Sequence, residues 1–152
     1  MTDSATDFTL LSDWQETGQI AACAILQDSK RRFLLQLRDL NPDTMGGGLW
    51  GVFGGRLEPD EDLRSCVARE MAEEIGITIP ATAFTPFARA QSPRGTRLYA
   101  YTCAQPITPS DIRLGEGAGF AFFTPDQIGK LDLLPAVQQI LHHFFENQAP
   151  KT

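Results

Sequence analysis

One short acidic segment constrains this chain more than any other feature of its sequence. It places four glutamates and an arginine at fixed spacing between two glycines: Gly55, Glu61, Arg69, Glu70, Glu73, Glu74 and Gly76. Carboxylates this close together repel one another, and lysines that could offset the repulsion at i,i+4 spacing are missing. Hard divalent cations prefer oxygen ligands, and Mg²⁺ usually binds substrate phosphates as well. The segment therefore predicts metal-assisted phosphate chemistry.

The periodicity of the segment predicts a helix from about residue 61 to residue 75. Apolar residues recur every four positions and form one stripe that would pack on a core: Leu63, Val67, Met71 and Ile75. Asp60 or Asp62 can cap the start of the helix, where negative charge is favourable. Gly76 fits the position just past the end, where a left-handed conformation is usual.

The glutamates occupy one side of this expected helix. Glu70, Glu73 and Glu74 fall within an arc of roughly 100° that adjoins the apolar stripe. The alternative interpretation is an ordinary solvated acidic face. The preceding Gly-Gly pair and the adjacent Arg69 favour a functional site instead.

The segment also resembles a known signature. It matches G-x5-E-x7-R-E-U-x-E-E-x-G-U, with U apolar, which is the signature of the Nudix hydrolases, and Met71 and Ile77 fill the apolar places. Asp60 stands where many members of that family have glycine, a departure that changes no fixed letter. The resemblance implies an α/β fold, an α/β/α sandwich with a mixed β-sheet.

Helix geometry suggests which side chains would hold a metal ion. Carboxylates at i,i+4 can reach one ion from successive turns, so Glu70 and Glu74 are the expected primary ligands, followed by Glu73. The resemblance implies that the Gly54 carbonyl also contacts the metal, which would be Mg²⁺ or Mn²⁺. Glu61 is expected to be an orienting group or a secondary ligand.

Arg69 is expected to act through a neighbour. Its positive charge makes it an unsuitable metal ligand, and an ion pair that fixes a glutamate is the more natural use of it. The resemblance implies the same role.

The general base is a separate question. Family members often supply a further glutamate from a loop about forty residues past the signature, and Glu116 lies at that distance here between two glycines. Glu70 is the competing candidate for the base. The expected catalytic set is therefore Glu70, Glu74, Glu116 and Arg69.

Length and composition agree with one soluble enzyme domain. The 152 residues are sufficient for a single core, and we expect residues 1–18 to be a tail or a short extra element before a domain at 19–148. A net charge of −6 argues against long nucleic acid, but a small anionic nucleotide could still bind through a metal. The first 18 residues lack an apolar signal-peptide core, and no apolar run reaches membrane length. Three widely spaced cysteines fit free thiols in the cytoplasm.

Elsewhere the chain alternates between strand and helix patterns. Strands are expected at 20–27, 33–38, 50–57, 84–91, 97–104 and 119–123, with turns at 28–30 and 92–95 and a loop at about 39–48. The Gly54-Gly55 pair is expected to form the turn between the third strand and the acidic helix. Thr124-Pro125 reads as the start of another helix, and the last helix is expected at 135–146.

Substrate-binding residues are harder to assign from sequence. Arg38, Phe53 and Arg97 are the candidates for contacts to phosphate or base, although Phe53 could equally belong to the core. The expected reaction is attack of water on a nucleoside diphosphate linked to another moiety, giving a nucleoside monophosphate. The alternative is a non-catalytic Nudix-fold module that senses a nucleotide or metabolite. A homodimer is compatible with the family resemblance.

Overall fold

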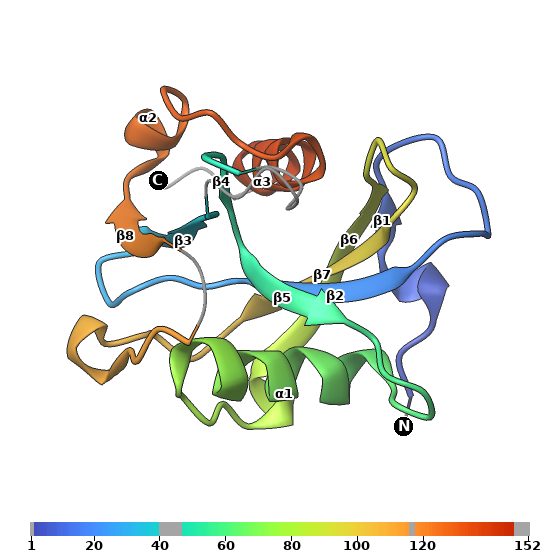
Figure 1. Ribbon diagram of the computed structural model, residues 1–152, viewed down its shortest axis with the longest axis horizontal. Coiled ribbons are helices and arrows are strands. Elements are labelled where there is room, and N and C mark those ends of the chain that lie inside the picture. The colour runs from blue at the N-terminus through green and yellow to red at the C-terminus, as the bar shows by residue number, and fades with distance from the viewer. Residues whose placement is uncertain (1, 40–46, 116–117, 148–152) are drawn as a thin grey trace.

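The computed structural model describes residues 2–39, 47–115 and 118–147 (Figure 1). The strands in these ranges are β1 (Thr9–Leu10), β2 (Ile20–Ile25), β3 (Phe33–Leu37), β4 (Trp50–Gly51), β5 (Phe53–Arg56), β6 (Phe84–Gln91), β7 (Arg97–Cys103) and β8 (Gly119–Phe123). The α-helices are α1 (Leu63–Ile75), α2 (Pro125–Ile128) and α3 (Pro135–Glu146). Single 3₁₀ turns lie at Ala5–Asp7, Ala81–Ala83 and Pro109–Asp111.

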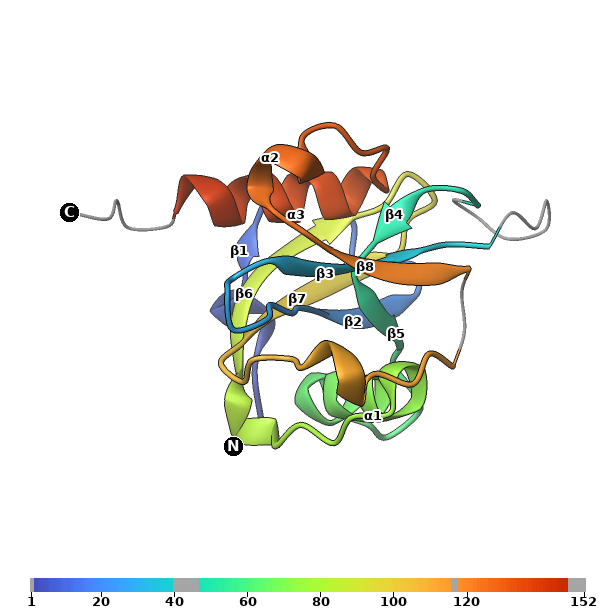
Figure 2. The same cartoon turned by 90° about the vertical axis from the view of Figure 1, so that its left-hand side faces the viewer.

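Two sheets form the framework. The larger sheet has the order β1-β6-β7-β2-β5, in which β1/β6 and β2/β7 are parallel pairs and β6/β7 and β2/β5 are antiparallel. Helices α1 and α3 cover its opposite faces (Figures 1 and 2). This arrangement confirms the expected α/β/α sandwich with a mixed sheet. The smaller antiparallel sheet, β4-β3-β8, was not anticipated as a separate unit.

Strand β2 shows how the sequence produces two cores. Ala22 and Ala24 belong to the cluster beneath α1, whereas Cys23 and Ile25 belong to the cluster beneath α3. Successive side chains of a strand point to opposite faces, so a continuous apolar run is buried on both sides. The central position of β2 follows from this pattern.

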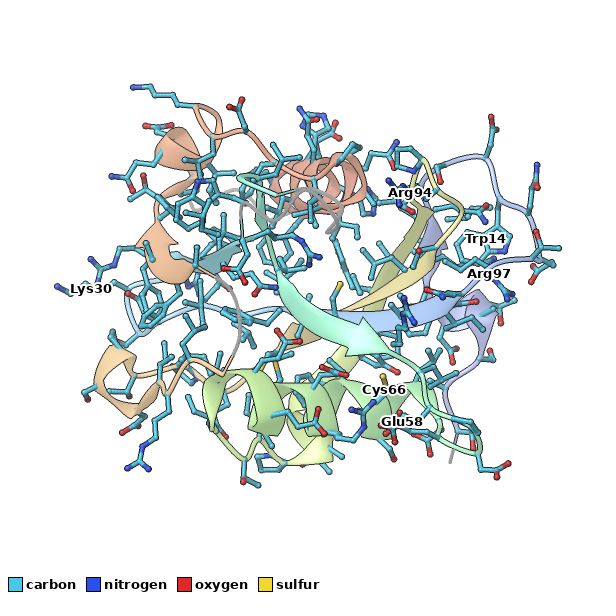
Figure 3. The ribbon with its side chains drawn as sticks, in the orientation of Figure 1. Trp14, Lys30, Glu58, Cys66, Arg94 and Arg97 are labelled. Carbon is cyan, nitrogen blue, oxygen red and sulfur yellow. The ribbon has the colours of Figure 1, made fainter. Side chains whose placement is uncertain are left out.

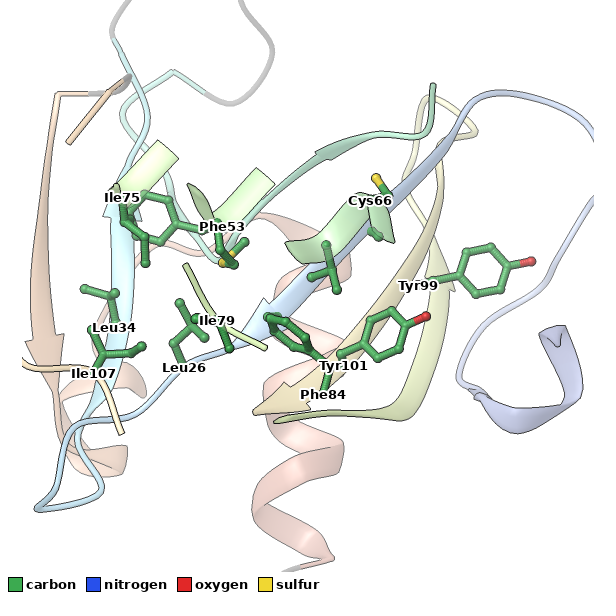
Figure 4. Packing of buried hydrophobic residues seen from close by; sticks show 14 of the residues in the cluster. Leu26, Leu34, Phe53, Cys66, Ile75, Ile79, Phe84, Tyr99, Tyr101 and Ile107 are labelled. Atoms are coloured by element: carbon green, nitrogen blue, oxygen red, sulfur yellow. The ribbon is translucent and has the colours of Figure 1, made fainter. Parts of the chain in front are cut away.

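The cluster beneath α1 holds the acidic helix in place (Figure 4). Val67, Met71 and Ile75 of the predicted apolar stripe are fully buried, and Leu63 is partly buried at the helix start. Phe53 is fully buried in the same cluster. Its ring therefore packs inside the protein and does not face a substrate, which corrects its place among the substrate-binding candidates.

The region before the helix differs from the sequence prediction. A single strand was expected over 50–57, but β4 and β5 belong to different sheets and are interrupted at Val52. Gly54 and Gly55 lie inside β5 and do not form a turn. The chain crosses from one sheet to the other here, a tertiary event that periodicity cannot reveal.

Most other local predictions are confirmed. The Ser92–Gly95 turn joins β6 to β7, with Gly95 at φ 92° and its N–H donating to the Ser92 carbonyl. Thr124 caps α2 through its side chain, and Pro125 is the first helical residue. The expected loop at 39–48 lies largely outside the described residues.

None of the helices in the described ranges is long and apolar enough to span a bilayer.

The N-terminal segment packs on the domain. Phe8 is buried and makes edge-to-face contacts with Tyr99 and Tyr101 of β7. Asp3 receives hydrogen bonds from Arg64 Nε at 2.9 Å and from the Tyr101 hydroxyl at 2.9 Å. Arg64 also donates to the Ala81 carbonyl at 2.7 Å. Asp3 thus links the first turn of α1 to the large sheet.

We expect the substitution Asp3→Ala to lower the free energy of unfolding by about 2 kcal/mol, because it leaves the mostly buried Arg64 guanidinium without its charged partner. Urea denaturation measures this change. The matched control is Asp13→Ala, which removes an exposed carboxylate from the same segment and should stay within about 0.5 kcal/mol of wild type. Equal effects from the two substitutions would contradict this account.

Candidate active site

Local capping fixes the limits of the acidic helix. The Asp62 carboxylate accepts a hydrogen bond from Ser65 N at 2.8 Å, and Gly76 ends the helix at φ 70°. Because Asp62 is the cap, α1 begins at Leu63, not at residue 61 as expected from periodicity. Glu61 therefore precedes the helix.

A tight turn brings Glu61 back toward the helix. Glu61 N donates to the Glu58 carbonyl at 3.1 Å, and Glu58 N donates to Glu61 Oε1 at 3.1 Å. Asp60 within this turn has φ 64°, a left-handed conformation that suits glycine and is also tolerated by aspartate. The departure from glycine at this position is therefore compatible with the turn.

Arg69 is the centre of the site. Its Nε and Nη2 atoms donate to the two oxygens of Glu61, at 2.7 and 2.9 Å. Its Nη1 atom donates to Glu70 Oε1 at 3.0 Å and to Glu73 Oε2 at 3.2 Å. Nη2 also donates to the Arg56 carbonyl at the end of β5, at 3.0 Å. One guanidinium therefore ties three carboxylates to the edge of the large sheet.

The contact between Arg69 and Glu61 shifts the pKa of both groups. Hydrogen bonds from Arg69 lower the pKa of Glu61 despite its burial, and the same bonds raise the pKa of Arg69. Both groups therefore stay charged at neutral pH. Cys66 lies beside them on α1, and burial raises the pKa of its thiol to about 12, so this thiol is not a reactive nucleophile (Figure 3).

The two glycines of β5 have different neighbours. A Cβ at Gly55 would lie 2.3 Å from the Glu70 carboxylate, so this carboxylate rests directly on the strand backbone. A Cβ at Gly54 would lie 2.3 Å from the Ala22 carbonyl oxygen and 2.6 Å from the Cys23 Cα of β2. Gly54 thus permits strand pairing, whereas Gly55 makes room for a carboxylate of the site.

The remaining glutamates of the helix differ in exposure. The Glu73 side chain is 58% exposed, while Glu74 is buried one turn beyond Glu70. In the part of the chain that the structure describes, no group of three or more His, Cys, Asp or Glu side chains is arranged so that it could hold a metal ion. The carboxylates of Glu61, Glu70 and Glu73 are instead gathered around Arg69.

The other predicted site residues are more scattered. Arg97 donates to the Gly18 carbonyl at 2.8 Å and to Glu16 at 3.3 Å, so its guanidinium binds the N-terminal segment (Figure 3). Arg38 follows the end of β3 and is partly buried. Glu116 lies outside the described residues. Sequence reasoning missed the backbone contacts that Gly115 makes with α1, for which the only sequence sign was a glycine next to Glu116.

Comparison with known proteins identifies the family to which the chain belongs. Residues 17–146 match the sequence model of the NUDIX domain. The chain is 26% identical over 133 residues to the CTP pyrophosphohydrolase of Escherichia coli K12, covering 88% of this chain and 95% of that protein. It also matches the crystal structure of a MutT protein from Methanosarcina mazei Go1, with a TM-score of 0.64 and 25% sequence identity. That match covers 94% of this chain and 99% of the MutT chain.

A further structure shares the fold. The bifunctional NMN adenylyltransferase/ADP ribose pyrophosphatase from Francisella tularensis, complexed with AMP and a manganese ion, is 21% identical, with a TM-score of 0.69. The match covers 86% of this chain and 42% of that one. Because the NUDIX match spans most of the sequence, the chain belongs to the Nudix family and is a Nudix hydrolase.

The different neighbours of Gly54 and Gly55 predict opposite effects of an added methyl group. Gly54→Ala should lower the free energy of unfolding by about 2 kcal/mol or more, because its Cβ would meet the backbone of β2. Gly55→Ala should keep stability within about 1 kcal/mol of wild type, because the Glu70 side chain can move aside. Its turnover should nevertheless fall about 10-fold or more, since that carboxylate is displaced.

Denaturation and steady-state assays of the two variants measure both effects. Full activity in a stable Gly55→Ala protein would show that the position of the Glu70 carboxylate against β5 is unimportant. Unchanged stability in Gly54→Ala would contradict the packing argument for β2 and β5.

Proposed function

We propose that this protein cleaves a nucleoside diphosphate linked to another moiety, using carboxylates of α1 to hold a divalent cation. As a Nudix hydrolase it hydrolyses nucleoside diphosphate derivatives. The observation that carries the proposal is the Arg69-centred arrangement, because it keeps charged carboxylates together at the junction of α1 and β5.

The donor set is chemically suited to Mg²⁺ or Mn²⁺. Both ions prefer oxygen ligands, and Glu70, Glu73, Glu74 and the Gly54 carbonyl all supply oxygen. The Glu70 carboxylate against Gly55 places such a donor beside the β5 backbone. Nudix hydrolases generally use divalent metals, and the Francisella tularensis structure holds manganese together with AMP. When bound, the cation would neutralise phosphate oxygens and lower the pKa of a water ligand.

Different side chains are proposed to bind the cation and to orient its ligands. Glu70 and Glu74, on successive turns, are the proposed primary ligands, and Glu73 assists them from the exposed side. Arg69 orients Glu70 and Glu73 through hydrogen bonds. Glu61 occupies both of its oxygens with Arg69, so we assign it an orienting function and not a primary metal contact.

Removal of a proton from the attacking water requires a base. We assign this step to Glu116, which comes directly after the segment that contacts the end of α1. Glu70 is the competing candidate, although its contacts with Arg69 and Gly55 suit a ligand better. The products would be a nucleoside monophosphate plus a phosphorylated moiety, or pyrophosphate when the substrate is a nucleoside triphosphate.

The relatives indicate which substrates to test first. CTP is one choice, because the Escherichia coli relative, which aligns over 95% of its length, is a CTP pyrophosphohydrolase. ADP-ribose is the other, because the Francisella tularensis protein is an ADP ribose pyrophosphatase. Arg38, at the end of β3, is a candidate for a substrate contact.

Cys23, Cys66 and Cys103 are free thiols, which supports placing the protein in the reducing cytoplasm. A homodimer stays a prediction.

A nucleotide panel with coupled phosphate detection tests the metal requirement. We expect turnover that needs Mg²⁺ or Mn²⁺ and stops with EDTA. Glu74→Gln should lower kcat about 10²-fold or more and weaken Mn²⁺ binding, because it replaces a charged ligand with a neutral amide. Asp126→Asn, which removes an exposed charge at the start of α2, is the matched control and should behave as wild type. Tight nucleotide binding without turnover across the panel would favour the non-catalytic alternative.

Replacement of Glu116 tests the base. Glu116→Gln should lower kcat by about 10²- to 10⁴-fold, the effect expected on losing a general base, while Mn²⁺ affinity changes little. Rapid-mixing kinetics measure turnover, and Mn²⁺ titration followed by electron paramagnetic resonance measures the Mn²⁺ affinity. Unchanged turnover would remove Glu116 from the mechanism and leave Glu70 as the base.

A further inference from the structure

Strand β5 is the outermost strand of the large sheet on the side of the carboxylates. Leu57 N donates to the Ile20 carbonyl of β2 at 2.9 Å, just after β5 ends. Because hydrogen bonding alternates along an antiparallel pair, the backbone groups of Arg56 and Gly54 face away from β2. The Arg56 carbonyl accordingly accepts a hydrogen bond from Arg69 Nη2 at 3.0 Å. Arg56 and Gly54, the proposed carbonyl ligand, therefore share the outer edge of the sheet.

The side chains of β5 alternate between the two faces of the sheet. A Cβ at Gly55 would lie 2.3 Å from the Glu70 carboxylate, so Gly55 faces α1. A Cβ at Gly54 would lie 2.6 Å from the Cβ of Cys23, which belongs to the cluster beneath α3, so Gly54 faces the other way. Arg56 shares the face of Gly54. Its side chain therefore leaves the strand on the face opposite to the carboxylates, beside the edge where a cation would bind.

The surroundings of Arg56 on that face leave its charge unpaired. Its partner on β2, Ala21, belongs to neither core cluster, so the apolar packing beneath α3 stops short of Arg56. Arg56 is exposed, and its guanidinium makes no hydrogen bond or ion pair with any residue that the structure describes. A free guanidinium thus lies on the strand that carries the site, whereas Arg69 is occupied by carboxylates.

Other arginines are either paired or distant from β5. Arg32, Arg64 and Arg97 form ion pairs with carboxylates, and Arg89 stacks on the Trp14 ring. In the described ranges, the exposed arginines whose guanidinium makes no such contact are Arg31, Arg56, Arg94 and Arg113. Of these four, Arg56 is the one that belongs to a strand of the site.

We propose that Arg56 binds a phosphate group of the substrate across the outer edge of β5. A cation on Glu70 and the Gly54 carbonyl would hold a diphosphate at this edge, and Arg56 follows two residues later, about 7 Å along a strand. A long arginine side chain can cover this distance, and a guanidinium can donate two parallel hydrogen bonds to a phosphate. The carboxylates attract the cation but repel phosphate, so Arg56 supplies an attraction that they do not. This inference rests on the proposed function.

The test compares Arg56→Gln with the matched control Arg94→Gln. Arg94 is exposed in the turn between β6 and β7 (Figure 3). Both variants should unfold at the wild-type urea midpoint, because each removes an exposed, unpaired charge. Arg56→Gln should raise KM about 10- to 100-fold, the loss expected for a hydrogen bond to a charged group, with kcat within about threefold. Arg94→Gln should stay within about twofold in both constants.

A KM within about twofold of wild type for Arg56→Gln would overturn the inference. Arg56→Lys keeps the positive charge but loses the paired donors, so its KM should lie between those of wild type and Arg56→Gln. Mn²⁺ affinity without substrate should be the same in Arg56→Gln and wild type, because Arg56 is not a metal ligand. This last result separates Arg56→Gln from Glu74→Gln.

Inorganic pyrophosphate distinguishes a phosphate contact from a contact to base or sugar. It has neither a base nor a sugar, and in the presence of Mn²⁺ its inhibition constant should rise in Arg56→Gln by about the same factor as KM. An unchanged inhibition constant beside a raised KM would place Arg56 against the base or sugar, which would overturn the assignment to phosphate.

Failure of this inference can be told apart from failure of the proposed function. A wild-type protein that hydrolyses no nucleotide of the panel would overturn the proposed function, and this inference with it. Wild-type turnover that Arg56→Gln leaves unchanged would overturn only the role of Arg56.

Discussion

The pairing of Arg69 with its surrounding carboxylates is the interaction on which the site depends. Without it, the charges of Glu61, Glu70 and Glu73 would repel one another on a short stretch of chain. The bond to Glu61 is bidentate and mostly buried, so it is stronger than the exposed contact to Glu73, for which about 0.2–1 kcal/mol is typical. A single arginine therefore holds the acidic cluster together through hydrogen bonds.

The rest of the fold determines where this cluster lies. The apolar face of α1 packs beneath β2 and β5, and the N-terminal segment fixes the first turn of the helix through Asp3 and Arg64. Gly55 lets the Glu70 carboxylate approach the β5 backbone, and Gly115 brings the loop after β7 to the other end of the helix. Both ends of α1 are thus held by segments distant in sequence, while its C-terminal half carries the carboxylates.

Sequence patterns predicted features that depend on neighbouring residues. The four-residue apolar period located the buried face of α1, and the Asp62 and Gly76 caps follow from known preferences at helix ends. The signature predicted the ion pair of Arg69 with a glutamate. Features that depend on distant contacts were not predictable in this way. Asp3 and Tyr101 lie 98 residues apart, and the contact of Gly115 with Glu73 involves only backbone, which leaves no side-chain pattern to read.

The claim that α1 binds a catalytic cation is tested most directly by crystallography with Mn²⁺ and a non-hydrolysable nucleotide. Anomalous scattering distinguishes manganese from the lighter atoms of the protein and the nucleotide. The account predicts a peak bonded to carboxylate oxygens of Glu70 and Glu74, at about 2.0–2.3 Å, with nucleotide phosphate oxygens on its other side. A structure with nucleotide bound and manganese either missing from these side chains or held elsewhere would contradict it.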